Sequence, residues 1–435
     1  MNKTRAWTGC IVFALSALAV SEAYAQAAAQ IQPLTPREPE SEAARGETVI
    51  TRQRPELDPL GIRAGSFLIY PKLGVEETYN DNVFAVRHQT KDDFITDIKP
   101  EISAESNWSN HALNFGVGAD SGVYADFGDL NYNDWFVRSD GRIDITRDAA
   151  VFLGGGFAHE HEDPGEPDAA TDAKKPTQYD LINGIARYIQ TFGRLRATGE
   201  AGIIRLDYDQ TDLVGGGEQS NTGRDRNVYT EGVRIGYELS PAYEAFVRVD
   251  GNQRVYDTRQ DGSGVERNST GVTSVAGVSL DLGGIVFGDV FAGYLGQYFN
   301  DNSFNDVNGF TAGGTMTWNV TTLTTLNARV ARTIQDTTQA GSPAFLRTSG
   351  GLSADHELLR NLILTATATV TNDNYEDVNR NDYYYITGIG ARYLMNRNIY
   401  ANIGYQFVRH TSNGSDTTDD SYYQNMFRIG LEAQL

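Results

Sequence analysis

The sequence predicts an all-β fold in which antiparallel, up-and-down strands close into a transmembrane barrel. Three observations support this fold class. Apolar and polar residues alternate strictly over most of the chain. The connections between these segments alternate between short and long. The 435 residues include 45 Gly and 23 Tyr, a composition that favours extended strands over helix bundles. We expect about 18 strands, with about 16 as the alternative.

The first 25 residues have the parts of a cleaved export signal. Lys3 and Arg5 precede an apolar stretch over 11–20, and Ala23-Tyr24-Ala25 fits the small-x-small cleavage rule. The apolar stretch is too short to span a membrane comfortably as a helix. We therefore predict a signal peptide over 1–25. Cys10 is the only cysteine and lies inside it, which excludes a disulfide framework, a zinc ribbon and an iron–sulfur site.

Residues 26–65 differ in composition from the rest of the chain. They are rich in Pro, Glu, Arg and Ala and contain no aromatic residue. Such a composition is typical of a flexible tail. We predict a flexible periplasmic N-terminal segment here. The sequence leaves open whether it stays in the periplasm or enters the pore from below.

The predicted barrel occupies residues 66–435, where the hydrophobic period is two. In the last segment Phe427, Ile429 and Leu431 alternate with Arg428, Gly430 and Glu432. Alternation of this kind gives each strand one apolar and one polar face. The predicted strands are 66–79, 94–106, 110–124, 133–146, 149–160, 178–191, 194–208, 227–239, 242–256, 269–282, 285–299, 309–320, 323–335, 344–357, 361–373, 383–395, 398–410 and 421–435.

The connections place the two ends of the barrel. Short turns such as 147–148 and 240–241 alternate with long loops such as 161–178 and 209–225, as in outer-membrane barrels. Because the first connection is long and the strand number is even, both termini belong on the short-turn, periplasmic side. A soluble β-sandwich fits less well because these strands are long for one. A solenoid would need a fixed repeat period, and the sequence has none.

The acidic balance of the chain constrains its partners. With 57 acidic and 36 basic residues, the net charge is −21, and the long loops are especially acidic. An acidic chain is poorly suited to bind nucleic acid. Asn-Asp-Asn opens the loops at 80–82, 300–302 and 372–374, which we interpret as strand ends rather than calcium sites. Weak divalent-cation binding by the acidic rim, shared with lipopolysaccharide, is a further hypothesis. We predict no built metal site and no cofactor.

Aromatic residues near the strand ends are candidates for membrane-interface girdles. The candidates at the periplasmic ends are Trp108, Tyr188, Tyr237, Trp318, Tyr393 and Tyr400. Those at the external ends are Tyr79, Tyr124, Tyr132 and Trp135.

The start of the barrel carries a family resemblance. The segment 64–71, followed by Leu73-Gly74-Val75 and by the run 79–84, resembles the Putative beta-barrel porin 2 family of Gram-negative bacteria. The resemblance implies an outer-membrane barrel, and several family members are linked to secretion of a surface polysaccharide. It therefore implies polysaccharide export as the leading function, with a polysaccharide and periplasmic export components as partners.

If the apolar residues face lipid, the alternating set faces the lumen, where water makes charge inexpensive. The predicted pore-lining residues are Lys72, Glu76, Lys99, Glu101, Arg138, Asp140, Arg142, Asp144, Arg196, Glu200, Arg234, Arg248, Asp250, Arg329, Arg347, Arg392 and Arg428. Fixed charges of both signs on facing walls would orient polar solutes as they pass.

Three functions are compatible with these features. The first is polysaccharide export; the second is a general or solute-selective diffusion porin; the third is a structural or adhesive barrel with acidic surface loops. An enzyme is not predicted, because no motif ties His159, His161 or His410 to a nucleophile. We expect the protein in the outer membrane, in contact with lipid and lipopolysaccharide. The sequence does not indicate an oligomeric state.

Overall fold

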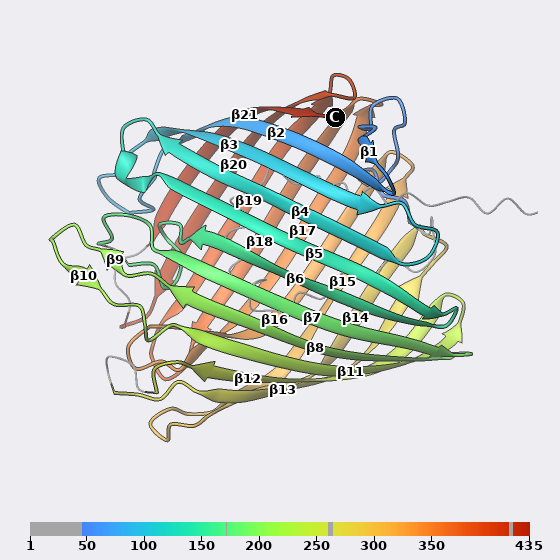
Figure 1. Ribbon diagram of the computed structural model, residues 1–435. Coiled ribbons are helices and arrows are strands. Elements are labelled where there is room, and N and C mark those ends of the chain that lie inside the picture. Colours follow the sequence, from blue (N-terminus) through green and yellow to red (C-terminus); the bar gives the residue numbers. More distant parts are fainter. Residues whose placement is uncertain (1–45, 171, 260–263, 417–420) are drawn as a thin grey trace, which may run out of the picture.

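In the computed structural model the chain forms a closed antiparallel barrel of 18 strands (Figure 1). The structure describes residues 46–170, 172–259, 264–416 and 421–435. The predicted signal peptide lies outside the described residues, as does the part of the N-terminal segment before residue 46. In the described ranges, no helix is both long enough and apolar enough to cross a membrane.

The barrel strands follow one another along the chain, and each pairs with its neighbours in sequence. Their bounds are β2 (Phe67–Asn80), β3 (Asp93–Ser106), β4 (Ala112–Tyr124), β5 (Tyr132–Thr146), β6 (Ala149–His161), β7 (Gln178–Phe192), β8 (Leu195–Tyr208), β11 (Arg226–Ser240), β12 (Tyr243–Tyr256), β13 (Ser269–Asp281), β14 (Val286–Phe299), β15 (Val307–Thr321), β16 (Thr324–Asp336), β17 (Ala344–Leu359), β18 (Leu362–Tyr375), β19 (Asn381–Leu394), β20 (Ile399–Asn413) and β21 (Tyr422–Gln434).

Pairing between the first and last of these strands closes the barrel. β2 pairs with β21 from Lys72 opposite Gln434 to Asn80 opposite Met426. Closure satisfies the backbone groups of both edges, which lipid could not do. The predicted fold class is therefore confirmed, including the estimate of about 18 strands.

Among the described residues, four short elements lie outside the 18 barrel strands. β1 (Ile62–Ala64) pairs with the start of β2. β9 (Thr211–Asp212) and β10 (Glu218–Gln219) form a small hairpin in the β8–β11 loop. A 3-10 turn, η1 (Gly128–Leu130), lies between β4 and β5.

Short turns gather at one end of the barrel and long loops at the other (Figure 1). The tight β13–β14 turn shows how sequence fixes such a connection. Gly283 and Gly284 have φ of 65° and 76°, and the amide of Ile285 donates to the carbonyl of Leu282. A turn with two positive φ angles matches the twist of the flanking strands, and glycine adopts it without strain.

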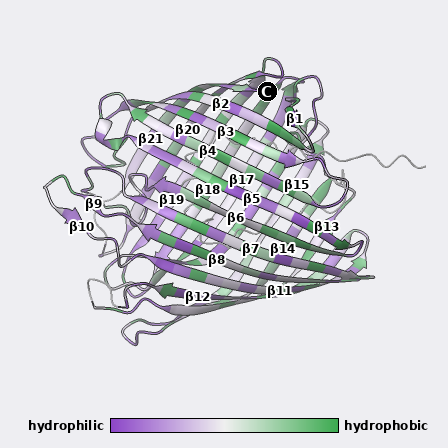
Figure 2. Ribbon diagram, viewed as in Figure 1, coloured by the Kyte–Doolittle hydropathy of each residue, from purple (hydrophilic) through white to green (hydrophobic). Residues whose placement is uncertain are grey.

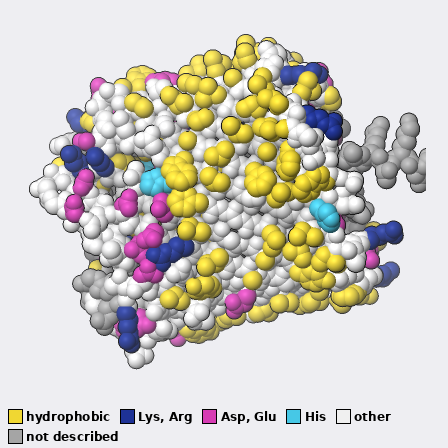
Figure 3. Space-filling view, viewed as in Figure 1, with side chains coloured by type: hydrophobic (Ala, Val, Ile, Leu, Met, Phe, Trp, Pro, Cys, Tyr) yellow, Lys and Arg dark blue, Asp and Glu magenta, His cyan; other side chains and the backbone are white. Residues whose placement is uncertain are grey.

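Hydrophilic and hydrophobic residues alternate along the strands (Figure 2), and their exposures place the apolar ones on the outer face and the polar ones on the inner face. On β21, Ile429 and Leu431 are 63% and 57% exposed, whereas Arg428 and Glu432 beside them are buried. The space-filling view shows apolar side chains over the middle of the visible wall and more charged ones toward the loop end (Figure 3). Such an apolar belt suits contact with lipid.

Part of the predicted aromatic girdles is wrong, because some of the aromatic residues point into the barrel. Trp108, Trp318 and Trp135 are exposed on the outer face, as predicted. Tyr400 and Tyr124 are instead 6% and 9% exposed, on the inner faces of β20 and β4. Tyr132, also predicted for a girdle, has an inward hydroxyl that donates to Asp97 of β3, two strands away (2.7 Å). Successive side chains of a strand point to opposite faces. Each of these tyrosines occupies a position of its strand that points inward.

Pro100 interrupts the pairing of β3 with β4 but does not change its register. Between β3 and β4, pairing runs to Ile98 opposite Ser121 and resumes at Glu101 opposite Gly118. The register is the same on both sides of this gap. Proline has no backbone N–H to donate to the ladder. The gap therefore falls at Lys99 and Pro100, which lie opposite Asp120 and Ala119 of β4.

Candidate functional site: the barrel interior and its two mouths

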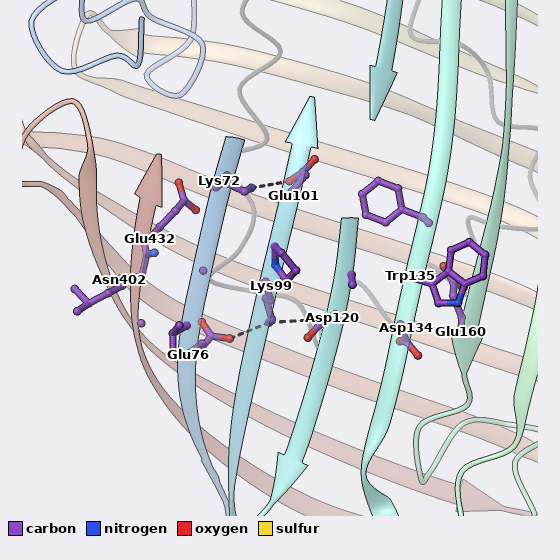
Figure 4. Close-up of a pocket in the computed structure, with 17 residues that line it drawn as sticks. Lys72, Glu76, Lys99, Glu101, Asp120, Asp134, Trp135, Glu160, Asn402 and Glu432 are labelled. Atoms are coloured by element: carbon purple, nitrogen blue, oxygen red, sulfur yellow. Dashed lines mark hydrogen bonds and ion pairs between the residues drawn. The ribbon is translucent and has the colours of Figure 1, made fainter. Parts of the chain in front are cut away.

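Ion pairs cross the inner faces of β2 to β5. Lys72 and Arg138 both contact Glu101, at 2.8 and 3.1 Å. Lys99 contacts Glu76 at 3.3 Å (Figure 4). Five residues from the predicted pore-lining set therefore form two connected groups on neighbouring strands.

The same pattern continues along β5. Arg142 contacts Asp144 at 2.9 Å, two residues away on the same face. Asp140 accepts a hydrogen bond from Asn114 of β4 at 2.8 Å.

The inner faces of β7 to β12 carry a second network. Glu200 accepts a 2.7 Å hydrogen bond from Arg187, while Arg248 contacts Asp250 at 2.8 Å. Arg234 and Arg196 share Glu244, at 2.8 and 3.6 Å. Two of the partners, Arg187 and Glu244, were not among the predicted pore-lining residues. Their positions on the polar side of the alternation were the signal that could have found them.

The remaining predicted residues lie between β16 and β21. Arg347 donates to Asp373 at 2.7 Å, and Arg392 contacts Glu432 at 2.9 Å. Arg428 is buried, with a guanidinium nitrogen 3.5 Å from the sulfur of Met426. Arg329 is opposite Thr315 and Gly351 in the ladder and is more exposed than the other arginines of this group.

Two long loops meet across the barrel. Asp168, in the β6–β7 loop, accepts hydrogen bonds from the Thr337 hydroxyl (2.9 Å) and from the Thr338 amide (2.9 Å), both in the β16–β17 loop. These loops leave the barrel at almost opposite points of the strand order. Thr337 is only 3% exposed. We call this contact of residues 162–170 with residues 336–339 the loop bridge.

Further polar contacts anchor both ends of the loop bridge. Asp336 contacts Arg226 of β11 (3.1 Å) and Arg254 of β12 (2.5 Å), several strands away. Glu162 accepts a hydrogen bond from Arg224 (3.0 Å). Burial, together with the charges of Glu162 and Asp163, raises the pKa of Glu166 well above its usual value.

Apolar clusters line the inner wall at the loop end. Ala85, from the β2–β3 loop, packs with Ile386, Val408 and Met426 of the wall. Similar clusters contain Leu181 of β7 and Leu295 of β14. At the loop end, packed apolar side chains thus lie on the inner wall together with charged pairs such as Arg347 and Asp373.

The described start of the chain packs against the short-turn end. Arg54 is 3% exposed and contacts Glu357 of β17 at 2.8 Å. The Val49 amide donates to the Thr325 hydroxyl (3.0 Å), and the Tyr400 hydroxyl donates to the Leu57 carbonyl (2.8 Å). Residues 48–58 therefore lie against strands β16 to β20.

The three histidines considered as candidate bases, His159, His161 and His410, each contact a carboxylate. Ser412 donates its hydroxyl to Asp382, and His410 lies 3.8 Å from the same carboxylate. His159 contacts Asp180 at 2.7 Å. In the described ranges, no group of three or more His, Cys, Asp or Glu side chains could hold a metal ion.

The comparison with protein families decides the assignment. The family model described as Putative beta-barrel porin 2 matches residues 54–435. The chain belongs to this family. Its members are outer-membrane porin-type barrels, so the outer-membrane location and channel-like architecture follow, and the resemblance of segment 64–84 is confirmed.

Solved structures that match the chain come from Pseudomonas aeruginosa and Acinetobacter baumannii, among others. OpdK of Pseudomonas aeruginosa, crystallised with vanillate, is 10% identical, with 84% of this chain and 99% of that chain covered and a TM-score of 0.44. OccAB3 of Acinetobacter baumannii is 10% identical over 84% and 99% of the chains, with a TM-score of 0.43. OccK3 of P. aeruginosa is 14% identical over 84% and 95%, with a TM-score of 0.40. No curated protein matches the chain significantly.

Proposed function

We propose that the protein is a solute-selective diffusion channel for small polar molecules in the Gram-negative outer membrane. The loop bridge carries this proposal. A loop that crosses the barrel and contacts the opposite side divides the passage at the loop end. A divided passage lined by fixed charges suits small solutes better than a long polymer. The exposed apolar belt would contact outer-membrane lipid and lipopolysaccharide.

Polysaccharide export is the function that the family resemblance implies. It would require a passage through which a polymer chain can move. A glycan chain would need the loop bridge to open along its whole contact, including the buried Thr337. A structural or adhesive barrel is the third candidate, and it requires no passage at all.

Conductance and secretion together separate these functions. The purified barrel is reconstituted in planar bilayers, and liposome swelling is measured with a pentose and with a tetrasaccharide. We expect steady conductance, swelling with the pentose and none with the tetrasaccharide. In a deletion strain we expect surface polysaccharide to remain unchanged. Periplasmic accumulation of polysaccharide in that strain would overturn the proposal in favour of export. A barrel without conductance would favour the structural role.

A further inference from the structure

A cavity of about 280 Å³ runs along the inner wall from β20 and β21, across β2 to β5, to β6 (Figure 4). Its lining includes two lysines, Lys72 and Lys99, and six carboxylates, namely Glu76, Glu101, Asp120, Asp134, Glu160 and Glu432. Arg138 and Arg392 contact two of these carboxylates from outside the lining. Acidic groups therefore remain in excess, which favours a cationic occupant.

The carboxylates follow the pairing of the strands. Glu76 is opposite Asp97, and Asp120 is opposite Asp134. Glu160 lies beside Asp134, since the adjacent pair is Trp135 opposite His159. Neighbouring strands are about 4.7–4.9 Å apart, so the row repeats negative charge at roughly that interval. Two carboxylates in directly opposite positions destabilise a sheet, so this arrangement is costly to the fold.

Lys99 shows what the acidic row binds. Its ammonium nitrogen lies 3.3 Å from Glu76, 3.4 Å from Asp120 and 3.9 Å from Asp97. One ammonium group is thus shared among carboxylates from three neighbouring strands. Beyond Lys99, toward β6, Asp134 contacts His161 and Glu160 accepts a hydrogen bond from the Tyr179 hydroxyl.

Two residues that line the cavity, one on β20 and one on β4, each contain a buried acceptor atom that lacks a hydrogen-bond partner among the described residues. On β20 it is Oδ1 of Asn402, a residue only 8% exposed. On β4 it is Oδ1 of Asp120. A buried acceptor without a donor costs free energy, about 1–3 kcal/mol in typical cases. A ligand that brings several N–H donors along one line would satisfy both atoms.

We infer that this cavity is a binding site for linear polyamines, which the channel would conduct. Three or four methylene groups separate the ammonium groups of such molecules, a spacing close to that of neighbouring strands. An extended polyamine would place successive ammonium groups against the carboxylates and an end group at Asn402. This inference rests on the proposed channel function and names its solute class.

Titration calorimetry with spermine, a tetraamine long enough to reach from β20 to β4, and the folded barrel in detergent micelles tests the inference. We expect one site per barrel, with 1,8-octanediol, an elongated uncharged molecule, showing no binding. Asp120→Asn on β4 and Asn402→Leu on β20 should each weaken spermine binding about tenfold or more. Asp289→Asn removes one carboxylate from the inner face of β14, outside this cavity, and should leave the affinity unchanged.

Folding is checked by the temperature at which the folded band is lost in SDS gels. Asp120→Asn should not lower it, because this change removes repulsion with Asp134. Equal affinities for Asp120→Asn, Asp289→Asn and the parent chain would overturn the inference, as would spermine binding no tighter than K⁺ at matched ionic strength. Bilayer conductance without spermine is recorded separately. If the barrel conducts ions but shows no polyamine binding, only the inferred polyamine site is wrong. If the barrel does not conduct, the proposed channel function is wrong as well.

Discussion

Among individual residues, the buried pair of Arg347 and Asp373 has the clearest energetic role. The Asp373 side chain has no exposed area and that of Arg347 is 7% exposed. Removing one member of such a pair leaves the other charge buried and uncompensated, at a cost of about 3–5 kcal/mol. The pair therefore fixes β17 to β18 near the loop end, although it adds little net stability compared with an apolar pair.

Asp373→Asn should therefore destabilise the barrel by a few kcal/mol, in the range of about 3–5. The expected result is a clear fall in the temperature at which the folded band converts to the unfolded band in SDS gels. Asp355→Asn is the matched control, since Asp355 lies on the same inner face of β17 and accepts one hydrogen bond from Thr365. Equal shifts for both variants would contradict the assigned role of the pair.

At the level of the elements, one side chain, that of Asp168, links the β6–β7 loop to the β16–β17 loop. Asp168 accepts bonds from the Thr337 and Thr338 hydroxyls and from the Thr338 amide. Each such bond contributes about 1 kcal/mol or somewhat more. Asp168→Ala should release the loop and increase single-channel conductance. Asp172→Ala removes the same charge from the same loop and should not. Unchanged conductance in Asp168→Ala would show that the loop bridge does not limit the passage.

The same loop should respond to pH through Glu166. Its pKa is raised by burial, Glu162 and Asp163. The folded loop therefore holds the proton more tightly than a released loop, and its stability is lost as pH rises from the ordinary glutamate value through the raised pKa. Conductance should increase over that range. Glu166→Gln should remain at the low-pH level, while Glu218→Gln, in the outer hairpin, should follow the parent profile. A parent profile identical to that of Glu166→Gln would refute this account.

The N-terminal segment depends on Glu357, which contacts Arg54 at 2.8 Å and Arg52 at 3.2 Å. Glu357→Gln should loosen the segment, because it leaves the buried Arg54 without its carboxylate. We expect trypsin to cleave after Arg52 at least tenfold faster than in the parent barrel. Asp355→Asn, two positions away on the same face, is again the control. Cleavage at the parent rate would mean that other contacts hold the segment.

At the scale of the whole molecule, the net charge of −21 should attract cations to the channel. Reversal potentials under a KCl gradient should give a preference for K⁺ over Cl⁻ at about 0.1 M salt. This preference should weaken toward 1 M, because the screening length falls from about 10 Å to about 3 Å. A preference for Cl⁻ would contradict the view that the acidic loops and inner wall dominate the field.

The sequence by itself determined the local periodicity and much that follows from it. Period-two alternation gave the strands, and short and long connections gave the two ends of the barrel. The polar side of the alternation also included Lys72, Glu101 and Arg347, whose ion pairs the structure describes. These features are local, since each depends on residues a few positions apart.

The tertiary structure alone decided which distant residues meet. Asp168 and Thr337 are 169 positions apart in the chain, and Arg54 and Glu357 are 303 apart. Closure of the barrel brings such residues together, and no periodicity encodes the pairing. The inward side chains of Tyr124 and Tyr400 were missed for a related reason. A one-residue difference in parity reverses the face of a side chain, and irregular strand ends fix that parity only in the folded sheet.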